Sequence, residues 1–371
     1  MSTNKKIILT GGHAATTAIS VIEELIRRKK KFGWDIYWVG ARMAVEGKTV
    51  PTLEFEVLPK LGVKFLPIVT GRIQRKFTFW TIPSFLKIPL GFIHALILLL
   101  RVRPEIIVSF GGFAAFPVVV VGWFLGIPVV IHDQTATAGR ANKASSFFAR
   151  KIAVARKTSL KHFPSDKTVL IGNPILTQIA EITPKEEKGN PPVIFILGGS
   201  RGSQTLNEVL EKCLINLLPR YEIVHVTGHL DYQNFLTIKK NLPVSLSNHY
   251  EVYDRIDPLK IDNLYREADM VVARAGANTV SEIIATKRPS ILVPIPWSYL
   301  NEQKENALLA KDFGVAEIIE QDNLNDQTLI KAIDQVNSNW SNLMLKVRDK
   351  KSPDKEASTK MVDLILDILN D

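Results

Sequence analysis

The residues best suited to chemistry lie in the stretch Arg274–Glu282, which reads Arg-Ala-Gly-Ala-Asn-Thr-Val-Ser-Glu. The segment 268–272 before it, Ala-Asp-Met-Val-Val, predicts a short buried strand, and 280–286 predicts the first two turns of a helix. A strand, a turn of small residues and a helix bring backbone N–H groups to bear on an anion. We therefore expect a phosphate site here. An ordinary turn between a strand and a helix is the alternative that this stretch alone leaves open.

Individual residues of this stretch have distinct chemical uses. Gly276 and the alanines beside it let a ligand approach the backbone, while Thr279 and Ser281 add hydroxyl donors. Glu282 is expected inside the first helical turn, where the helix dipole favours a carboxylate. Its carboxylate can also accept hydrogen bonds from a sugar diol.

A second candidate is the turn Gly11-Gly12-His13, which follows a predicted strand at 6–10. A helix over 15–31 and a strand over 35–39 complete a βαβ unit, which predicts a parallel sheet. The turn lacks the third glycine of a dinucleotide-binding fingerprint. His13 lies at the mouth of the turn, where it is either a base facing a ligand or a packing or capping residue.

The βα rhythm continues through the first half of the chain. The pattern predicts a strand at 106–109, a turn at Gly111-Gly112, a helix near 117–125 and a strand at 128–132. A polar loop follows over 132–143. Because ligands bind at the carboxyl ends of parallel strands, the loops after these strands are expected to converge on one edge of the sheet and form a site.

The alternation of predicted strands and helices begins again after the segment 183–192, which is rich in proline and polar residues. A strand at 193–197 leads into a glycine turn over 198–203, and the pattern then predicts a helix at 206–217 and strands at 222–227 and 290–294. The remainder from 301 to Asp371 is expected to be helical. The fold class is therefore α/β, with domains at 1–178 and 179–371 facing across a cleft, and the last helix is free to pack back on the first domain.

Composition and charge narrow the class of protein. The chain has 371 residues and a single cysteine, which excludes an internal disulfide framework, and no spacing resembles a zinc site. The single cysteine suits a reducing cytoplasm, and we expect no signal peptide before the first strand. Residues 1–178 hold 25 Lys and Arg against 9 Asp and Glu, whereas 179–371 hold 22 against 28. The basic first half is expected to face something anionic, either nucleic acid or a membrane surface.

Residues 71–104 favour the membrane. Cationic side chains alternate there with bulky aromatic ones, as in segments that lie at a lipid interface. The alternative is a helix that packs on the sheet behind an aromatic loop. The 19 uncharged residues of 113–131 contain two prolines and two glycines, so we expect two short buried elements and no spanning helix. Nucleic-acid binding is disfavoured because the cations accompany apolar residues. The expected membrane contacts are Arg72, Arg75, Lys76, Phe79 and Trp80.

Taken together, these landmarks resemble the MurG family of GT-B glycosyltransferases, over almost the whole chain. Members of that family transfer GlcNAc from UDP-GlcNAc to the lipid-linked muramyl-pentapeptide of peptidoglycan synthesis. The matching marks are Thr10-Gly-Gly-His13, Gly111-Gly112, 128–134, Ala138-Gly139, Asn142-Lys143, Gly172-Asn-Pro174, 198–202, Ala268-Asp269, Arg274–Glu282, and Gln303 with Asn306-Ala307.

The resemblance implies a UDP-GlcNAc site made of several loops. Ser200 would donate to the diphosphate, Glu282 would hold the ribose diol and Gln303 would contact the GlcNAc hydroxyls. The uracil would pair with backbone near Ile256 or Leu259. The other implied contacts are Thr10, Gly11, Gly12, Thr135, Leu176, Ala277, Asn278, Thr279, Val280 and Ser281. The chain departs from the family pattern at several positions, among which Asp133 replaces a glutamate, Thr135 an asparagine and Leu176 an arginine that would contact the donor.

The implied reaction inverts the anomeric carbon as the muramyl 4-hydroxyl displaces UDP. His13 is the first candidate for the base and Asp133 the second, whereas His132 is expected to pack or hydrogen-bond at its strand end. No Asp-x-Asp cluster follows a strand, so no metal or other cofactor is expected. The expected partners are UDP-GlcNAc, a polyprenyl-diphosphate-linked muramyl peptide and the anionic cytoplasmic face of the cell membrane, and no nucleic acid. Alternatives are a glycolipid synthase, a UDP-GlcNAc epimerase and a UDP-sugar-binding homologue with weakened catalysis. A nucleotide-dependent oxidoreductase is the least favoured.

Overall fold

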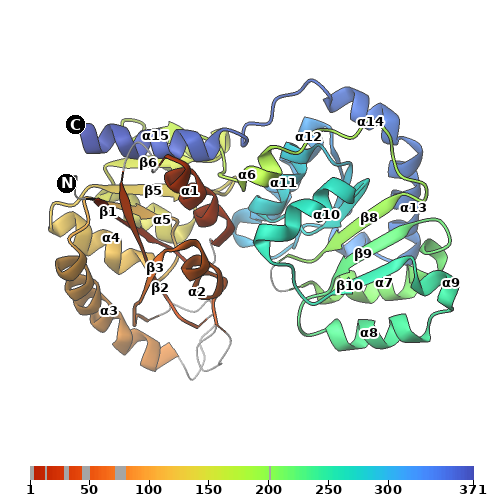
Figure 1. The fold of residues 1–371 in the computed structure, drawn as a ribbon, viewed down its shortest axis with the longest axis horizontal. Coiled ribbons are helices and arrows are strands. Elements are labelled where there is room, and N and C mark those ends of the chain that lie inside the picture. Colours follow the sequence, from red (N-terminus) through yellow and green to blue (C-terminus); the bar gives the residue numbers. More distant parts are fainter. Residues whose placement is uncertain (1–3, 13–14, 29–32, 44–50, 72–80, 200–201) are drawn as a thin grey trace. The chain divides into compact units, whose positions relative to one another are not determined.

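The computed structural model describes residues 4–12, 15–28, 33–43, 51–71, 81–199 and 202–371. The chain divides into two compact units, one of Met1–Leu176 with Pro353–Asp371 and one of Thr177–Ser352. Each unit contains a parallel β-sheet covered by helices (Figure 1). The predicted class, two parallel-sheet α/β domains, is confirmed. The cleft between them stays a prediction.

The first unit is built on a seven-stranded sheet with the order β3-β2-β1-β4-β5-β6-β7. Every neighbouring pair is parallel, and β1 lies between β2 and the central strand β4. The strands predicted at 6–10 and 106–109 are confirmed in this sheet. Its strands are β1 (Lys5–Thr10), β2 (Trp34–Gly40), β3 (Lys64–Pro67), β4 (Ile106–Ser109), β5 (Val129–Asp133), β6 (Lys151–Val154) and β7 (Thr168–Leu170).

Helices bury both faces of this sheet. Ile8 packs in a cluster with residues of α3 and α4, among them Leu99 and Val119. Because side chains alternate along a strand, Ile7 and Leu9 point to the opposite face. The helices of the unit are α1 (Ala15–Arg27), α2 (Leu53–Val57), α3 (Thr81–Val102), α4 (Ala115–Phe124), α5 (Arg140–Ser145) and α15 (Ala357–Asn370), with short 3₁₀ turns η2 (Leu58–Leu61), η3 (Ser146–Phe148) and η4 (Lys157–His162).

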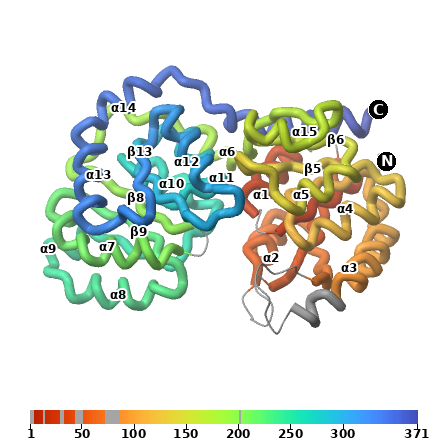
Figure 2. The backbone as a smooth tube through the Cα atoms, turned by 180° about the vertical axis from the view of Figure 1, so that it is seen from behind, coloured from red at the N-terminus to blue at the C-terminus, as the bar shows by residue number. Residues whose placement is uncertain are grey.

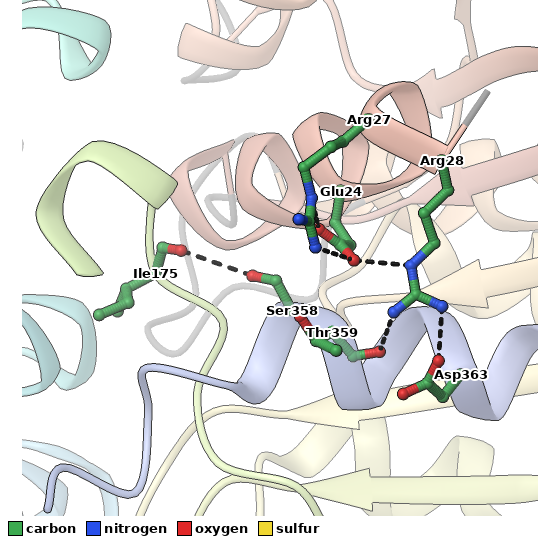
Figure 3. A network of polar contacts seen from close by, with 7 residues as sticks. All are labelled: Glu24, Arg27, Arg28, Ile175, Ser358, Thr359 and Asp363. Atoms are coloured by element: carbon green, nitrogen blue, oxygen red, sulfur yellow. Dashed lines mark hydrogen bonds and ion pairs between the residues drawn. The ribbon is translucent and has the colours of Figure 1, made fainter. Parts of the chain in front are cut away.

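The C-terminal helix α15 packs against α1, although more than 300 residues separate them in sequence (Figures 1 and 3). Arg28 joins the two helices, because its guanidinium contacts both Asp363 and the carbonyl of Thr359. Glu24 on α1 accepts hydrogen bonds from Arg27 and Arg28 in the same network. The last residues of the chain therefore complete the first unit.

The second unit is built on a six-stranded parallel sheet with the order β10-β9-β8-β11-β12-β13. The strand predicted at 193–197 is confirmed as its central strand β8. The expectation of an all-helical stretch after residue 301 was wrong, because β13 pairs with β12 at the edge of the sheet. The strands are β8 (Val193–Leu197), β9 (Glu222–Val226), β10 (Tyr250–Tyr253), β11 (Met270–Ala273), β12 (Ser290–Leu292) and β13 (Ala316–Ile318).

Two groups of helices cover this sheet. On one face, α7 and α13 pack around Ile194 and Ile196 of β8. On the other, Tyr265 of α10 meets Phe195. The helices and 3₁₀ turns of the unit are α6 (Thr177–Ala180), α7 (Gln204–Leu217), α8 (Tyr232–Asn241), α9 (Val244–Ser247), η5 (Pro258–Lys260), α10 (Ile261–Glu267), α11 (Ala277–Thr286), η6 (Tyr299–Asn301), α12 (Glu302–Phe313), η7 (Gln321–Asn323), α13 (Asp326–Ser338) and α14 (Trp340–Val347). Figure 2 traces the same chain from behind.

Within the described part of the chain, no helix combines the length and the apolar character that crossing a bilayer requires. The uncharged run 113–131 contributes α4 and strand β5, two short elements joined by a turn at Gly126. Both are largely buried in the first unit. The rejection of a spanning helix over 113–131 is therefore confirmed.

Candidate functional site

The glycine turns of the first unit meet at the carboxyl edge of its sheet, as predicted. The N–H of Gly12 donates to the carbonyl of Gly111 at 3.0 Å. Gly112 has φ of 94°, and a Cβ placed on it would lie 2.8 Å from the nitrogen of Gly12. Only glycine fits there, because any side chain would push the two loops apart. The loop after β5 belongs to the next strand along, so all three loops share one edge.

The predicted residues of the first loop differ in what they offer a ligand. The hydroxyl of Thr10 is fully buried and donates to the carbonyl of Val39 at 2.7 Å, so it fastens β1 to β2. Gly11 and Gly12 line a cavity of about 10 Å³, roughly the space of one water molecule. Glu54, a buried carboxylate on α2, lines the same cavity. His13 lies outside the described residues.

Asp133 is the central acceptor of the loop that follows β5. Its carboxylate is fully buried and accepts from the amide and the hydroxyl of Thr135, from the amide of Gly139 and from the side chain of Asn142. A carboxylate that accepts this many hydrogen bonds is fixed in place. The geometry therefore favours a structural role for Asp133. The hydroxyl of Thr135 donates its hydrogen to this carboxylate.

The end of the first unit is locked by a buried ion pair. Both guanidinium nitrogens of Arg156 donate to Asp354, at 2.6 and 2.9 Å, and the amide of Asn173 donates to the same carboxylate. His132 contacts the carbonyl of Gly172 at 3.2 Å, and burial lowers the pKa of His132 to about 4. The expectation that His132 packs at its strand end is therefore confirmed. Leu176, next to this cluster in sequence, is buried and offers no polar atom from its side chain.

The second unit brings its two glycine loops together in the same way. The loops 198–203 and 274–276 follow the adjacent parallel strands β8 and β11. Gly276 is the N-cap of α11 and has no side chain to cap it. A Cβ on Gly276 would meet nothing closer than the hydroxyl of Thr279 at 3.9 Å, so there is open space beside this backbone. Room next to an uncapped helix start suits a phosphate group. Ser200 lies outside the described residues.

Arg274 ties these two loops to a third. Its Nε donates to Ser203 Oγ at 2.8 Å, and its Nη1 donates to the carbonyl of Val293 at 3.1 Å. The side chain is buried, and no carboxylate among the described residues forms an ion pair with it. Burial therefore lowers the pKa of Arg274. A buried cation beside two glycine loops makes the region attractive to an anion.

Glu282 lies farther along its helix than predicted. Because α11 begins at Ala277, Glu282 is the sixth helical residue and lies in the second turn. The expectation of a first-turn carboxylate was wrong, since the small residues that suggested a longer turn are themselves helical. The carboxylate is buried and accepts from the hydroxyl of Tyr265 at 2.9 Å. Burial raises the pKa of Glu282 to about 7, although the tyrosine hydrogen bond opposes this shift.

The remaining predicted donor contacts surround the start of α11. Ala277 and Val280 are buried, and the hydroxyl of Ser281 donates back to the carbonyl of Ala277 at 2.8 Å. Asn278 and Thr279 are partly exposed in the first turn. On α12, the side-chain oxygen of Gln303 accepts from the amide of Ile295 at 3.0 Å, and the buried Asn306 donates to the carbonyl of Ala275. Ile256 is half-buried between β10 and η5.

A hollow of the second unit lies at the other edge of its sheet. It has a volume of about 400 Å³ and is lined by the first residues of β8 and β9, with Lys185, His249 and Arg266. Those are the amino ends of the strands, whereas ligands of such sheets bind at the carboxyl ends. The glycine loops and this hollow are therefore separate features.

The sequence assigns no individual role to three residues that lie at these loops. They are Tyr265, Arg274 and Glu54. Arg274 is the first residue of the stretch Arg274–Glu282. The sequence therefore predicts its location near the site, but not its hydrogen bonds to Ser203 and Val293. Nothing in the sequence marks Tyr265, because it lies 17 residues before its partner.

Comparison with known proteins decides the family. The model described as the glycosyltransferase family 28 N-terminal domain matches residues 8–154, and the corresponding C-terminal domain matches 193–365. The two matches together cover most of the chain. It belongs to glycosyltransferase family 28.

Relatives of this family 28 chain include proteins named UDP-N-acetylglucosamine--N-acetylmuramyl-(pentapeptide) pyrophosphoryl-undecaprenol N-acetylglucosamine transferase. The protein of Clostridium botulinum strain Hall is 32% identical, over 90% of this chain and 92% of its own. The second such transferase of Bacillus cereus ATCC 10987 is 30% identical, over 97% of this chain and 99% of its own.

Solved structures extend the comparison to the fold. Acinetobacter baumannii MurG is 25% identical with a TM-score of 0.69, and the match covers 98% of this chain and 99% of that one. A UDP-GlcNAc 2-epimerase of Neisseria meningitidis, crystallised with UDP-GlcNAc, has a TM-score of 0.65 at 12% identity, covering 98% of this chain and all of the other. At that identity the likeness shows the shared fold alone.

Proposed function

We propose that this family 28 chain is an inverting N-acetylglucosaminyltransferase that uses UDP-GlcNAc and glycosylates the 4-hydroxyl of a lipid-linked muramyl-pentapeptide. The names of the Clostridium and Bacillus relatives support the substrates. The main support for a UDP-GlcNAc site is the open start of α11, which has no side-chain cap. Glu282 lies on the same helix and Gln303 on the neighbouring helix α12. In this arrangement the diphosphate lies at the helix start, Glu282 holds the ribose and Gln303 reaches the sugar.

The reaction is a single displacement. The acceptor hydroxyl oxygen attacks the anomeric carbon of GlcNAc, the bond from that carbon to the diphosphate oxygen breaks, and UDP leaves with the electron pair. The leaving group gains negative charge in the transition state, and fixed N–H dipoles at a helix start stabilise that charge without rearranging. This part of the mechanism needs only backbone groups near Gly276 and Ala277.

A base must accept the proton of the attacking hydroxyl. His13 stays our first candidate, because it follows the Gly11-Gly12 turn and its ordinary pKa suits neutral conditions. Asp133 is less suited, since four donors hold its carboxylate. A His13→Asn variant should lose roughly 10²- to 10⁴-fold in kcat and keep its affinity for UDP.

The deciding experiment is a direct assay. The protein is incubated with labelled UDP-GlcNAc and a short-chain lipid-linked muramyl acceptor, without added metal. A disaccharide product that Glu282→Ala abolishes supports the proposal, with Glu208→Ala on the exposed face of α7 as the matched control. Product formation that survives Glu282→Ala would overturn the donor site. UDP-GlcNAc consumption without an acceptor would favour an epimerase, and UDP binding without turnover a binding protein.

The lipid-linked acceptor requires the first unit to approach a membrane, and the unit has a surface suited to one. The outer face of α3 exposes Leu90, Ile93, Ile97 and Leu100, each more than half exposed, at helical spacing. Phe124 at the end of α4 and Phe147 of η3 are also well exposed. An apolar stripe on the basic half of the chain fits the interface of an anionic bilayer.

This membrane surface, at the cytoplasmic face of the cell membrane, is tested with phosphatidylglycerol vesicles. Ile93→Ser with Ile97→Ser should reduce vesicle binding by about tenfold or more, because these two exposed isoleucines would become buried in the lipid when the protein binds. The same test applies to Arg72, Arg75, Lys76, Phe79 and Trp80, which lie outside the described residues. Ile215→Ser, at an exposed isoleucine of the second unit, is the matched control. Unchanged binding of both sets would rule out this surface.

A further inference from the structure

Tyr265 is held in place through both its backbone carbonyl and its ring. Its backbone carbonyl accepts from the guanidinium of Arg288 at 2.8 Å, and Arg288 also donates to the carbonyl of Thr286 at the end of α11. Its ring meets Phe195 of β8 edge to face, with ring centroids 5.4 Å apart. Such pairs fix the orientation of a ring as well as its position. The phenol therefore has one available direction.

That direction leads to Glu282. The Tyr265 hydroxyl donates to Glu282 Oε2 at 2.9 Å, and both side chains are buried. No other described residue donates to this carboxylate. With Oε2 occupied by the tyrosine, Oε1 is the oxygen left to accept from a ligand. One buried carboxylate with one protein donor is an incomplete set, since such a group usually accepts several hydrogen bonds.

A purely structural tie between α10 and α11 is the competing explanation. Arg288 already joins these helices through two backbone carbonyls, so a tie would not need the phenol. The hydroxyl also opposes the effect of burial on the pKa of Glu282. It therefore favours the ionised form, which is the form that accepts from both hydroxyls of a diol.

We propose that Tyr265 is a positioning residue that orients Glu282 toward the ribose of the nucleoside diphosphate, and that it thereby contributes to the preference for a ribonucleotide. This inference rests on the proposed function, in which Glu282 binds the ribose. Tyr265 itself touches no substrate and acts only through the carboxylate. Removing its hydroxyl should weaken the recognition of the ribose 2′-hydroxyl and leave the diphosphate contacts intact.

The test compares UDP with 2′-deoxy-UDP by calorimetric titration of the full-length protein from pH 6 to pH 9. Tyr265→Phe keeps the ring against Phe195 and removes only the hydroxyl. We expect Tyr265→Phe to bind UDP roughly three- to tenfold more weakly than the wild type does. Its affinity for 2′-deoxy-UDP should change little, so the ratio of the two affinities should fall. The pH at which UDP binding reaches its maximum should rise, because Glu282 loses the donor that favours its ionised form. In turnover, the KM for UDP-GlcNAc should rise while kcat is kept.

The matched control is Tyr221→Phe, since Tyr221 also donates to a carboxylate, Asp334 at 2.8 Å, within the same unit. It should leave both nucleotides unaffected. As a second variant, Phe195→Leu keeps the hydroxyl and loosens the ring, and it should shift the preference in the same direction by less. Equal weakening of both nucleotides, or an unchanged pH profile, would overturn the role of Tyr265.

The same titration separates this inference from the proposed function. If Glu282→Ala removes the preference for UDP and Tyr265→Phe keeps it, only the role of Tyr265 is wrong. If Glu282→Ala keeps the preference for UDP over 2′-deoxy-UDP, the carboxylate does not bind ribose. Both the proposed donor site and the role of Tyr265 are then wrong.

Discussion

Arg274 and Ser203, 71 residues apart in sequence, are joined by a hydrogen bond of 2.8 Å from the guanidinium Nε to the hydroxyl. Ser203 is also the N-cap of α7, where its hydroxyl accepts from the amide of Leu206. The same arginine reaches the end of β12 through Val293. One buried side chain therefore sets the relative positions of three loops at the carboxyl edge of the second sheet.

We predict that Arg274→Met weakens UDP binding by roughly 10- to 100-fold, because the loops lose their common donor and the site loses a buried positive charge. Arg274→Lys keeps the charge but loses the fork of donors, so its effect should be smaller yet clear. The measurement is the Kd for UDP. Arg220→Met, at an exposed arginine paired with Asp334, should bind UDP normally. Wild-type affinity in Arg274→Met would show that the arginine matters only for folding.

The raised pKa of Glu282 makes the stability of the second unit depend on pH. Burial raises this pKa from 4.5 to about 7. Between these two pH values, the carboxyl group is protonated in the folded state and ionised in the unfolded state. The resulting stabilisation is fully present below about pH 4.5 and is lost as pH rises through about 7. Above that pH the folded unit holds a buried, ionised carboxylate.

Glu282→Gln should therefore be more stable than the wild type at pH 8, by about 1 to 3 kcal/mol, and should lose this advantage toward pH 4.5. Thermal unfolding of both proteins across this range measures the difference. Glu208→Gln, at an exposed glutamate, should show no such crossover. A constant difference between wild type and Glu282→Gln at every pH would mean that Glu282 is not protonated in the folded protein near neutrality.

Much of the fold could be predicted because the central strands are buried runs that end at glycine turns. The runs 106–108 and 193–197 are continuous apolar segments, and such segments are typical of strands in a parallel sheet. The edge strand β13 has only three residues, of which one is exposed, so no periodicity distinguishes it from the helix before it. Short edge strands are set by their neighbours more than by their own sequence.

The candidate site was predictable in its location and less so in its contacts. Strand ends that carry glycine turns must converge in a parallel sheet, which placed both pairs of loops correctly. The direction of each side chain depends on tertiary packing. The hydroxyl of Thr10 points to Val39 of the neighbouring strand, and Glu282 pairs with a tyrosine from a different helix. No local pattern contains either relationship.

The buried ion pair of Arg156 with Asp354 fixes the returning C-terminal segment to the first unit. Asp354 also accepts from the amide of Asn173, and a Cβ on Gly172 would lie 2.4 Å from the carbonyl of Pro353. Asp354→Asn leaves a buried guanidinium without its charge partner, so we expect the first unit to lose about 3 to 5 kcal/mol of stability. Urea unfolding measures this loss. Asp363→Asn breaks an ion pair that is half exposed on the same segment and should cost under about 1 kcal/mol. Equal effects would contradict the assignment of Asp354 as the main anchor.

Asp133 offers the clearest separation of a structural role from a catalytic one. The amides of Thr135 and Gly139 donate to different oxygens of Asp133. Asp133→Asn replaces one of these oxygens with an NH2 group, which faces one of the two amides as a second donor, so the loop after β5 should open locally. We expect faster amide hydrogen exchange across 132–145 and a loss of about 2 to 4 kcal/mol in the stability of the first unit. UDP binding should stay unchanged. Asp334→Asn, at a partly exposed carboxylate that accepts from Arg220 and Tyr221, should show neither effect. Normal exchange in Asp133→Asn, combined with lost turnover and a flattened pH profile of kcat, would instead identify Asp133 as the base.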